Sequence, residues 1–328
     1  GFIGTHLSSL LHEVHPETKI YNLDIVEPGT PLPTVKNYKP ALRKGEEHAA
    51  TFIYCDVRQP IELEKVDITP DDVIFNFAAV HRTPGHPDPA YFETNIRGAE
   101  NVCAFAERHG IRKIVFTSSI APYGAAEELK EETTLPMPNT PYGISKLVAE
   151  KIHQTWQAGG EGRQLTIVRP GVVFGRGENG NFTRLYWGIR GHKFMYPGRK
   201  DTIKACIYVK ELVRFMLYRL EHHDSGVELY NCCYEPAYTI EHIVESMKRV
   251  TNMKVKVPFM PGWLIMTAAG IAGALGSPMG ICPARVRKLQ ISTNICGKKL
   301  SASGYRFHYT FEEALADWYK DNGNLYLQ

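Results

Sequence analysis

Runs of apolar, β-branched residues recur along the first two thirds of the chain, and longer amphipathic segments separate them. Such runs are typical of strands that are buried on both faces of a sheet. Two of the amphipathic segments have clear helix starts, at Asp88–Pro89 and at Thr140–Pro141. Strands that alternate with helices predict an α/β fold with a doubly wound parallel sheet. The predicted strands are 19–26, 51–57, 72–80, 113–119, 165–175 and 227–233, and the two helices are 88–110 and 140–159.

The alternation loosens beyond Arg176, where the chain becomes rich in glycine, polar and aromatic residues. It returns briefly to helix and strand and then takes a mostly helical pattern. We therefore predict two units, each made of two segments of the chain. The first is the doubly wound domain, residues 1–175 and 205–235, and the second is a smaller, mostly helical lobe, residues 176–204 and 236–328. Because the chain opens directly on a glycine turn, we expect a first strand to precede it.

Composition narrows the choice of partners. The net charge of the 328 residues is only +3 and Lys and Arg are scattered, so nucleic acid is not an expected partner. The seven cysteines show no metal-ligand spacing and are typical of reduced thiols in a cytoplasmic protein. The longest apolar run, 263–276, is too short to span a membrane. We favour a buried helix there, with a pocket wall or an interfacial helix as alternatives.

The first residues, Gly-Phe-Ile-Gly, place Gly1 and Gly4 at the start of a helical pattern. Glycines at such a turn let the backbone approach a pyrophosphate at a helix N-terminus. Asp24 ends the next predicted strand, about twenty residues on, where a carboxylate accepts hydrogen bonds from an adenosine ribose. The same carboxylate would repel a 2′-phosphate. The spacing therefore predicts a dinucleotide site that prefers NAD to NADP.

The segment Pro-Tyr-Gly-Ile-Ser-Lys carries the candidate chemistry. Tyr142 and Lys146 are one helical turn apart and share a face. A neighbouring ammonium favours the phenolate, so Lys146 can make Tyr142 a general base near neutral pH. Ser119 follows a buried strand, where open parallel sheets place their ligand cleft. Its hydroxyl can hold a substrate oxygen while Tyr142 takes the proton.

Together these motifs resemble the extended short-chain dehydrogenases/reductases of the nucleotide-sugar epimerase and dehydratase group, over essentially the whole chain. The resemblance implies a Rossmann domain that binds NAD, a C-terminal lobe that binds a nucleotide sugar, and a homodimer formed through two helices of the Rossmann domain. It also implies which residues contact the cofactor. These are Gly1, Phe2, Ile3, Gly4, Asp24, Asp56, Val57, Ala78, Ala79, Asn95, Thr117, Tyr142, Lys146, Pro170 and Val172.

The same resemblance implies a set of substrate contacts, with some departures. The 4,6-dehydratases carry an acidic pair directly after the serine position, but Ile120 and Ala121 stand there, so dehydration lacks its acid and base. Val172 replaces an asparagine and Lys204 an arginine that UDP-galactose 4-epimerases usually carry. His81 is explained equally well as a diphosphate contact and as a plain loop residue. Arg285 aligns only loosely with the phosphate-binding arginine of the family. The implied substrate contacts are His81, Ser119, Ile120, Asn181, Lys204 and Arg285.

Three functions follow in order of preference. The first is NAD-dependent epimerisation, at C4 of a UDP-hexose. The second is net oxidation or reduction of a keto sugar or an apolar alcohol, as in relatives that resemble 3β-hydroxysteroid dehydrogenases, and Val172 and the apolar run 263–276 favour it. The third is an NAD-sensing protein without catalysis. The complete set of Ser119, Tyr142 and Lys146 argues against the third, because a binding module needs no base.

Overall fold

The computed structural model describes residues 1–30, 37–42, 49–81, 85–124, 126–224, 226–264, 267 and 290–328 of the chain. Its centre is a parallel sheet in the order β11-β6-β4-β3, and β1 and β2 form a separate parallel pair. Each strand overlaps the apolar run that predicts it, which confirms the α/β fold. The bounds are β1 Tyr21–Asp24, β2 Thr51–Tyr54, β3 Val73–Asn76, β4 Lys113–Thr117, β6 Gln164–Pro170 and β11 Val227–Cys232.

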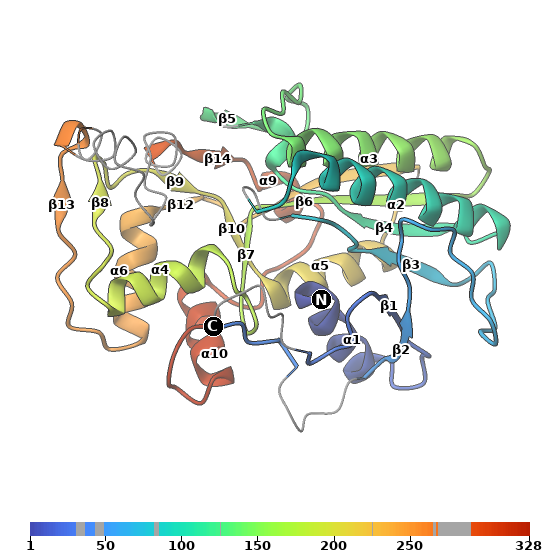
Figure 1. Cartoon of the computed structure of the whole chain (residues 1–328), viewed down its shortest axis with the longest axis horizontal. Coiled ribbons are helices and arrows are strands. Elements are labelled where there is room, and N and C mark those ends of the chain that lie inside the picture. Colours follow the sequence, from blue (N-terminus) through green and yellow to red (C-terminus); the bar gives the residue numbers. More distant parts are fainter. Residues whose placement is uncertain are drawn as a thin grey trace.

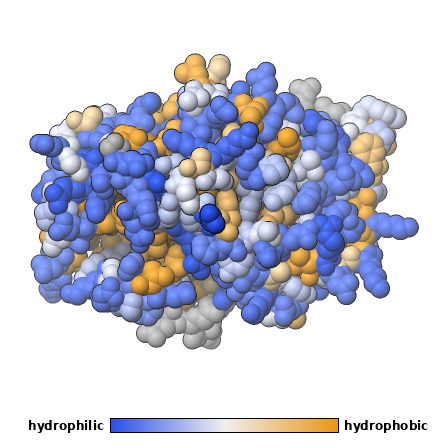
Figure 2. All heavy atoms as spheres, turned by 180° about the vertical axis from the view of Figure 1, so that it is seen from behind, coloured by the Kyte–Doolittle hydropathy of each residue, from blue (hydrophilic) through white to orange (hydrophobic). Residues whose placement is uncertain are grey.

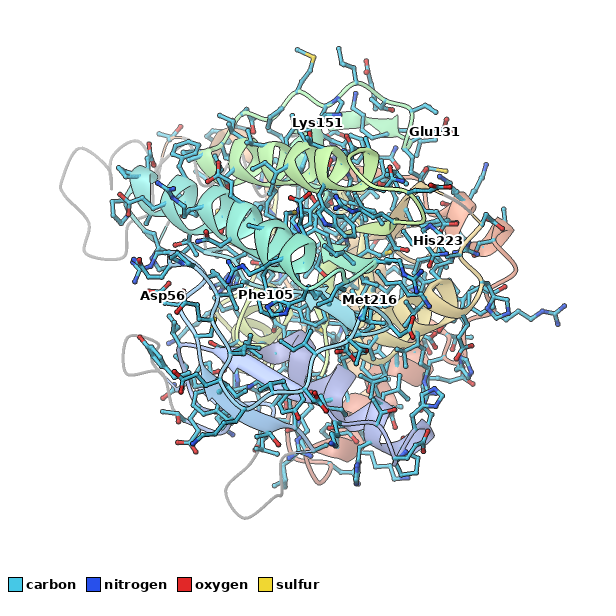
Figure 3. All side chains as sticks on the ribbon, turned by 90° about the vertical axis from the view of Figure 1, so that its right-hand side faces the viewer. Asp56, Phe105, Glu131, Lys151, Met216 and His223 are labelled. Atoms are coloured by element: carbon cyan, nitrogen blue, oxygen red, sulfur yellow. The ribbon has the colours of Figure 1, made fainter. Side chains whose placement is uncertain are left out.

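Helices cover both faces of this sheet. On one face α2 (Asp88–Arg108) and α3 (Pro141–Ala158) lie side by side, and on the other α1 (Phe2–Val14) packs against α5 (Val209–Glu221) (Figure 1). Each layer has its own core. Figure 3 shows Phe105 of α2 and Met216 of α5, which are buried in the two cores on opposite faces of the sheet.

Local chemistry sets the helix starts. Thr140 is the N-cap of α3, and its hydroxyl accepts a hydrogen bond from the Gly143 amide at 3.1 Å. The predicted N-cap of α2 is wrong by one residue. Pro87 occupies that position and Asp88 is the first helical residue, where its charge still favours the positive end of the helix dipole.

The apolar run 165–175 is not one strand but two, divided at Gly171. A side chain at Gly171 would place its Cβ 2.6 Å from the Ala205 carbonyl oxygen, so only glycine permits this approach. After it the chain leaves β11 and pairs with another strand. The two strands of that pair are β7, Val172–Phe174, and β10, Cys206–Tyr208.

The lobe has an aromatic core in which Phe174 packs with Phe182, Phe311 and Trp318. Its principal helices are α4 (Asn181–Arg190), α6 (Ile240–Val250), α9 (Lys298–Ala302) and α10 (Phe311–Asp321). Short strands add to the mostly helical pattern that the sequence predicts, in a sheet of order β12-β9-β14-β5 and a pair β13-β8. They are β5 Ala126–Lys130, β8 Tyr196–Pro197, β9 Ile203–Lys204, β12 Tyr238–Thr239, β13 Phe259–Met260 and β14 Thr293–Ile295. The division of the chain into two units stays a prediction.

The apolar run 263–276 lies mostly outside the described residues. The part that is described does not fit the favoured buried helix, because the side chains of Trp263 and Leu264 are 72% and 42% exposed. Among the helices of the described residues, none combines the length and the apolarity that crossing a bilayer requires.

A buried ion pair between α5 and β11 generates a prediction about stability. Arg219 donates to Glu228 at 2.6 and 3.0 Å, and both side chains are buried. Arg219→Ala would leave a carboxylate buried without its partner, which typically costs about 3–5 kcal/mol of the free energy of unfolding. Urea denaturation measures this loss. The matched control is Arg112→Ala, which breaks the exposed pair with Asp71 and should cost less than about 1 kcal/mol. Equal losses in the two variants would contradict the prediction.

Candidate active site

Ser119 lies at the carboxyl end of β4, and the helix that carries the tyrosine begins next to it. The Ser119 hydroxyl accepts a hydrogen bond from the Ala121 amide at 3.1 Å, which fixes the turn into the 3₁₀ helix η1 (Ala121–Tyr123). A Cβ on Gly143 would lie 2.7 Å from the Ala121 carbonyl oxygen. The glycine between the tyrosine and the lysine therefore lets the start of α3 approach the serine turn.

Tyr142 is partly buried beside this turn, and its ring lies 6.3 Å from the ring of Tyr91. Burial raises the pKa of the Tyr142 phenol, and a hydrogen bond with Ser119 acts in the opposite direction. The structure thus brings the predicted base and the predicted oxygen-holding serine together. Without a positive charge at the phenol, Tyr142 keeps its proton at neutral pH.

Lys146 is buried, with 1% of its surface exposed. Its ammonium donates a hydrogen bond to the Thr117 carbonyl at 2.6 Å and lies 4.2 Å from the centre of the Phe116 ring. Burial lowers the pKa of Lys146 to about 7, although the negative charge of Glu150 raises it in part. The lysine is therefore held at the end of β4, one helical turn from Tyr142.

A buried polar network beneath Lys146 was not found by sequence reasoning. The Glu150 carboxylate accepts hydrogen bonds from Ser118 at 2.5 Å and from Arg169 at 2.6 and 2.8 Å. Arg169 also lies over the ring of Tyr123, at 4.7 Å from its centre. Glu150 is four residues after Lys146, so the helical spacing was the available signal. Nothing in the sequence shows that Arg169 comes from the neighbouring strand to meet it.

The residues predicted to bind the dinucleotide meet at the start of α1. The Gly1 nitrogen lies 3.1 Å from the Asp24 carboxylate, which also accepts a hydrogen bond from the Val26 amide at 3.2 Å. A Cβ on Gly1 would lie 4.0 Å from the same carboxylate, so a side chain there would enter the space between turn and acid. Phe2 and Ile3 pack against the aromatic core, and Gly4 faces the Phe77 ring.

Asp56 and Val57 follow β2. Arg58 donates to the Asp56 carboxylate and thereby lowers its pKa. The Val57 carbonyl accepts a hydrogen bond from Asn101 at 2.7 Å, and a Cβ on Gly98 would come within 2.9 Å of the Val57 side chain. This segment is therefore fixed against α2.

Asn95 acts on the predicted cofactor lining through the backbone. Its amide accepts from the Val80 nitrogen at 2.8 Å and donates to the Val80 oxygen at 3.1 Å. It also donates to the Ser145 hydroxyl at 2.8 Å. Asn95, which lies on α2, thus ties the segment that contains Ala78 and Ala79 to α2 and, through Ser145, to α3.

Thr117 provides a test of whether the site fits a dinucleotide. Its hydroxyl is buried and has no hydrogen-bond partner among the described residues, as expected for a group that meets a ligand. Pro170 and Val172 flank the Gly171 turn at the carboxyl end of the neighbouring strand β6. Together with the glycine turn and the acid at the end of β1, this polar atom fits the cofactor that the sequence predicts.

The predicted substrate residues are more dispersed. Ile120 packs against the buried cluster of Tyr123, Ala205, Cys233 and Ile295. The Lys204 ammonium donates to the Ile291 carbonyl at 2.8 Å, whereas Asn181 is exposed at the start of α4 and accepts from Arg184 at 2.7 Å. His81 is exposed on the loop after β3. Arg285 lies outside the described residues.

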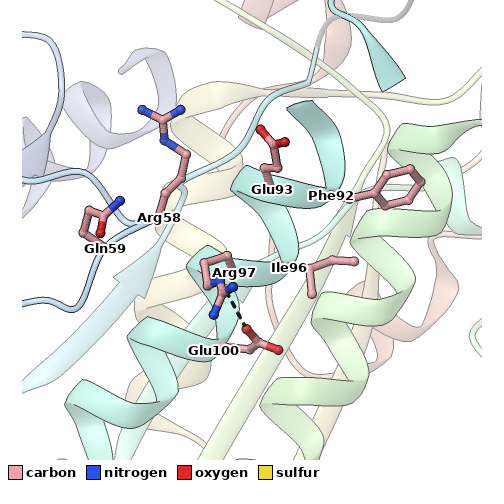
Figure 4. Close-up of a pocket in the computed structure, with 7 residues that line it drawn as sticks. All are labelled: Arg58, Gln59, Phe92, Glu93, Ile96, Arg97 and Glu100. Carbon is pink, nitrogen blue, oxygen red and sulfur yellow. Dashed lines mark ion pairs between the residues drawn. The ribbon is translucent and has the colours of Figure 1, made fainter. Parts of the chain in front are cut away.

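A surface hollow on α2 does not coincide with this site. It is lined by Arg58, Gln59, Phe92, Glu93, Ile96, Arg97 and Glu100 (Figure 4). Arg97 and Glu100 form an ion pair. Ser119, Tyr142 and Lys146 are not part of the hollow.

Comparison with known proteins agrees with the fold. One relative is the N-acetyl-alpha-D-glucosaminyl-diphospho-ditrans,octacis-undecaprenol 4-epimerase of Escherichia coli O157:H7. It is 32% identical over 266 residues, which cover 79% of this chain and 80% of the relative. Another is the UDP-glucose 4-epimerase of Lacticaseibacillus casei, 30% identical over 67% of this chain and 73% of the relative. Among solved structures, the UDP-glucuronic acid 4-epimerase of Bacillus cereus in complex with NAD superposes with a TM-score of 0.73. It is 18% identical and covers 99% of this chain and 94% of that one, so it supports the fold.

The sequence profile of the "NAD dependent epimerase/dehydratase family" matches residues 1–233, the segment that holds the glycine turn, Asp24, Ser119, Tyr142 and Lys146. This match confirms the family that the sequence motifs indicate, with NAD as its cofactor. The chain belongs to the NAD-dependent epimerase/dehydratase family.

Proposed function

We propose that the chain epimerises a sugar at C4 with NAD as cofactor, and that the sugar is carried on a diphosphate, with a UDP-hexose as the first candidate. The observation that carries the proposal is the meeting of Ser119, Tyr142 and Lys146 at the carboxyl end of β4. A base with a hydrogen-bonded hydroxyl beside it suits removal of a proton from a sugar hydroxyl.

In this mechanism Ser119 holds the C4 oxygen of the sugar and Tyr142 takes the hydroxyl proton. NAD, held by the Gly1–Gly4 turn and Asp24, would supply the hydride acceptor for C4 and then the hydride donor for the opposite face of the sugar. Tyr142 then gives its proton back to the oxygen. Since the redox change is internal, the cofactor stays bound and no second reductant is needed.

For Tyr142 to act as a base near neutral pH, a positive charge must lie near its phenol. Burial alone raises the pKa of Tyr142. A shift of about three pKa units toward neutrality needs about 4 kcal/mol of differential stabilisation of the phenolate. We assign this to the Lys146 ammonium, one turn away, and to the oxidised nicotinamide. The Glu150 carboxylate favours the charged form of Lys146 and so supports its role.

A net dehydrogenase or reductase of a keto sugar or an apolar alcohol remains the first rival, because the same three residues serve it. The two differ in the fate of the cofactor. An epimerase keeps NAD through many turnovers, whereas a dehydrogenase releases it each time. A pure NAD sensor is disfavoured, since it needs neither Tyr142 nor Ser119.

A second substrate candidate comes from the relative in Escherichia coli O157:H7, whose name describes an N-acetylglucosamine linked through diphosphate to undecaprenol. That relative matches more of this chain, and at higher identity, than the UDP-glucose 4-epimerase of Lacticaseibacillus casei. Both substrates present a sugar diphosphate to the active site. They differ in the group beyond the second phosphate, a nucleoside in one and a polyprenyl chain in the other.

We further propose a homodimer through α2 and α3. Phe92 and Ile96 lie on the side of α2 that faces α3 (Figure 4), and Ile144 and Val148 on α3 are 40% and 36% exposed. Apolar side chains at i and i+4 on adjacent helices suit packing against a second copy. A cytoplasmic location stays a proposal, in keeping with the six described cysteines, all of which are free thiols.

The first prediction concerns the base. Tyr142→Phe removes the ionisable hydroxyl but keeps the ring, so turnover should fall by about 10²–10⁴-fold while NAD still binds. Turnover of UDP-glucose and UDP-N-acetylglucosamine at saturating concentration measures the loss. Tyr319→Phe on α10 is the matched control and should retain activity. Near-normal turnover of Tyr142→Phe would remove the phenol from the mechanism.

The second prediction concerns the cofactor. Denatured wild-type protein should release NAD in stoichiometric amount and no NADP, because the Asp24 carboxylate repels a 2′-phosphate. Chromatography of the released nucleotide identifies it. Asp24→Asn keeps the shape but loses the charge, so the ratio of NADP affinity to NAD affinity should rise. An empty site in the wild type would favour the dehydrogenase, and equal affinity of the wild type for both nucleotides would contradict the role of Asp24.

The third prediction concerns the diphosphate. Removing one charge-assisted contact typically costs about 1.5–3 kcal/mol, so Lys204→Ala should weaken UDP binding by roughly tenfold or more. Calorimetric titration with UDP and with NAD separates the two sites, and the NAD affinity should not change. The matched control is Lys200→Ala, whose ammonium pairs with Glu241 at 2.9 Å. If UDP, dTDP and GDP all fail to bind the wild type, the diphosphate pocket is not built for a nucleotide.

A further inference from the structure

An exposed apolar surface lies on β13 and the turn that follows it. The side chains of Phe259, Trp263 and Leu264 are 50%, 72% and 42% exposed, and we call these three residues the apolar edge. Figure 2 shows hydrophobic side chains along the right-hand margin of that view, on the side where Figure 1 places β13. The turn is held in place, because β13 pairs with β8 and Gly262 packs on Gly198. The exposure is thus a property of an anchored segment.

The sequence around the apolar edge contains unusually few charged residues. Residues 257–284 contain no Asp, Glu, Lys or Arg. With 22% of the chain charged, a stretch of that length would on average hold about six charged residues. Cations stand at both of its ends, Lys254 and Lys256 before it and Arg285, Arg287 and Lys288 after it.

The chain beside the apolar edge is also basic. Residues 190–204, which include β8, carry five Lys or Arg and one acidic residue, Asp201. Lys254 and Lys256 are exposed and make no ion pair with a described residue. Arg199 and Lys200 are paired with acids, the first with Glu127 and Asp201 and the second with Glu241. Lys254 and Lys256 are therefore exposed cations, close in sequence to the apolar edge, whose charge no described acid neutralises.

We propose that the apolar edge docks on the surface of an anionic phospholipid bilayer. Trp and Phe side chains favour the boundary between headgroups and acyl chains, and neighbouring Lys residues are attracted by anionic headgroups. A second copy of the chain is a poorer occupant, because it would bring the exposed charges of Lys254 and Lys256 from both copies into one contact. Nucleic acid would match the cations but leave the apolar side chains in water.

The apolar edge is connected to the proposed active site through described residues. Gln290, whose side chain lies beside Gly198 and Gly262, leads to Ile291, which accepts the hydrogen bond from Lys204. The chain then enters β14, which pairs with β5, the strand after the Ser119–Tyr123 turn. Docking would thus place the substrate lobe against the lipid. That position suits the lipid-linked sugar diphosphate, the second substrate candidate, although the surface itself does not depend on the proposed function.

Vesicle binding without substrate tests the proposal. The full chain is sedimented with vesicles of phosphatidylcholine, alone or mixed with phosphatidylglycerol. The wild type should bind the mixed vesicles, and the double variant Phe259→Ser/Trp263→Ser should bind at least about tenfold more weakly. The matched control is Leu135→Ser/Met137→Ser, which removes two side chains that are 77% and 72% exposed on another loop. The control should bind like the wild type.

A second variant tests the charge. Lys254→Glu/Lys256→Glu should also lower binding at least about tenfold, since each cation near an anionic surface contributes about 1 kcal/mol. Wild-type binding should weaken as salt is raised. Failure of the wild type to bind, or equal losses in the Leu135/Met137 control, would overturn the proposal. So would a change in self-association of the apolar-edge variant by sedimentation velocity, which would assign the surface to a second copy.

Turnover of a water-soluble UDP-sugar, assayed without vesicles, separates this inference from the proposed function. The apolar-edge and charge variants should retain that turnover if the wild type shows it. A wild type that binds vesicles but turns over no UDP-sugar would leave the surface standing and count against UDP as the carrier.

Discussion

The site depends on one buried ammonium. Moving a charged group out of water costs several kcal/mol, and the lowering of the Lys146 pKa to about 7 reflects that cost. Two features offset it, the hydrogen bond to the Thr117 carbonyl and the negative charge of Glu150. Glu150 is itself buried and is held by Arg169 from β6. The position of Lys146 is therefore set by α3 and by two strands together, so the geometry of the site and the packing of the sheet form one constraint.

Close backbone approach is the second constraint. Gly143 lets α3 start against the Ser119 turn, and Gly171 lets β6 end against Ala205. The first brings the tyrosine to the serine. The second diverts the chain from the main sheet to β10 and so begins the lobe. Larger residues at either position would push apart the layers that the buried network requires to be in contact.

The sequence predicted those parts of this arrangement that depend on local spacing. The strands, α3 with its Thr140 cap and the Ser119–Tyr142–Lys146 set all follow from periodicity, capping or a short motif. It did not predict the partners that meet across long stretches of chain, such as Glu150 with Arg169 or Lys204 with Ile291. Asn95 shows the same limit, because its side chain holds the Val80 backbone, a role that no motif encodes. The exposure of Trp263 was missed because an apolar run reads the same whether a core or a lipid surface covers it.

Tyr142 and Lys146 lie on a different part of the fold from Lys204, and this affects how substrate choice can change. Tyr142 and Lys146 lie on α3, which packs against the sheet, and a shift there would disturb Arg169, Glu150 and Thr117 together. Of the candidate substrate contacts, Lys204 lies on the short strand β9 of the lobe and is anchored there by a hydrogen bond to a backbone carbonyl. Because a backbone carbonyl is present whatever the side chain, residues around Lys204 can vary at little cost to the catalytic set. If the reaction needs only a sugar diphosphate in the cleft, the group beyond the second phosphate is selected by the lobe alone, and the same chemistry can serve a nucleotide or a lipid carrier.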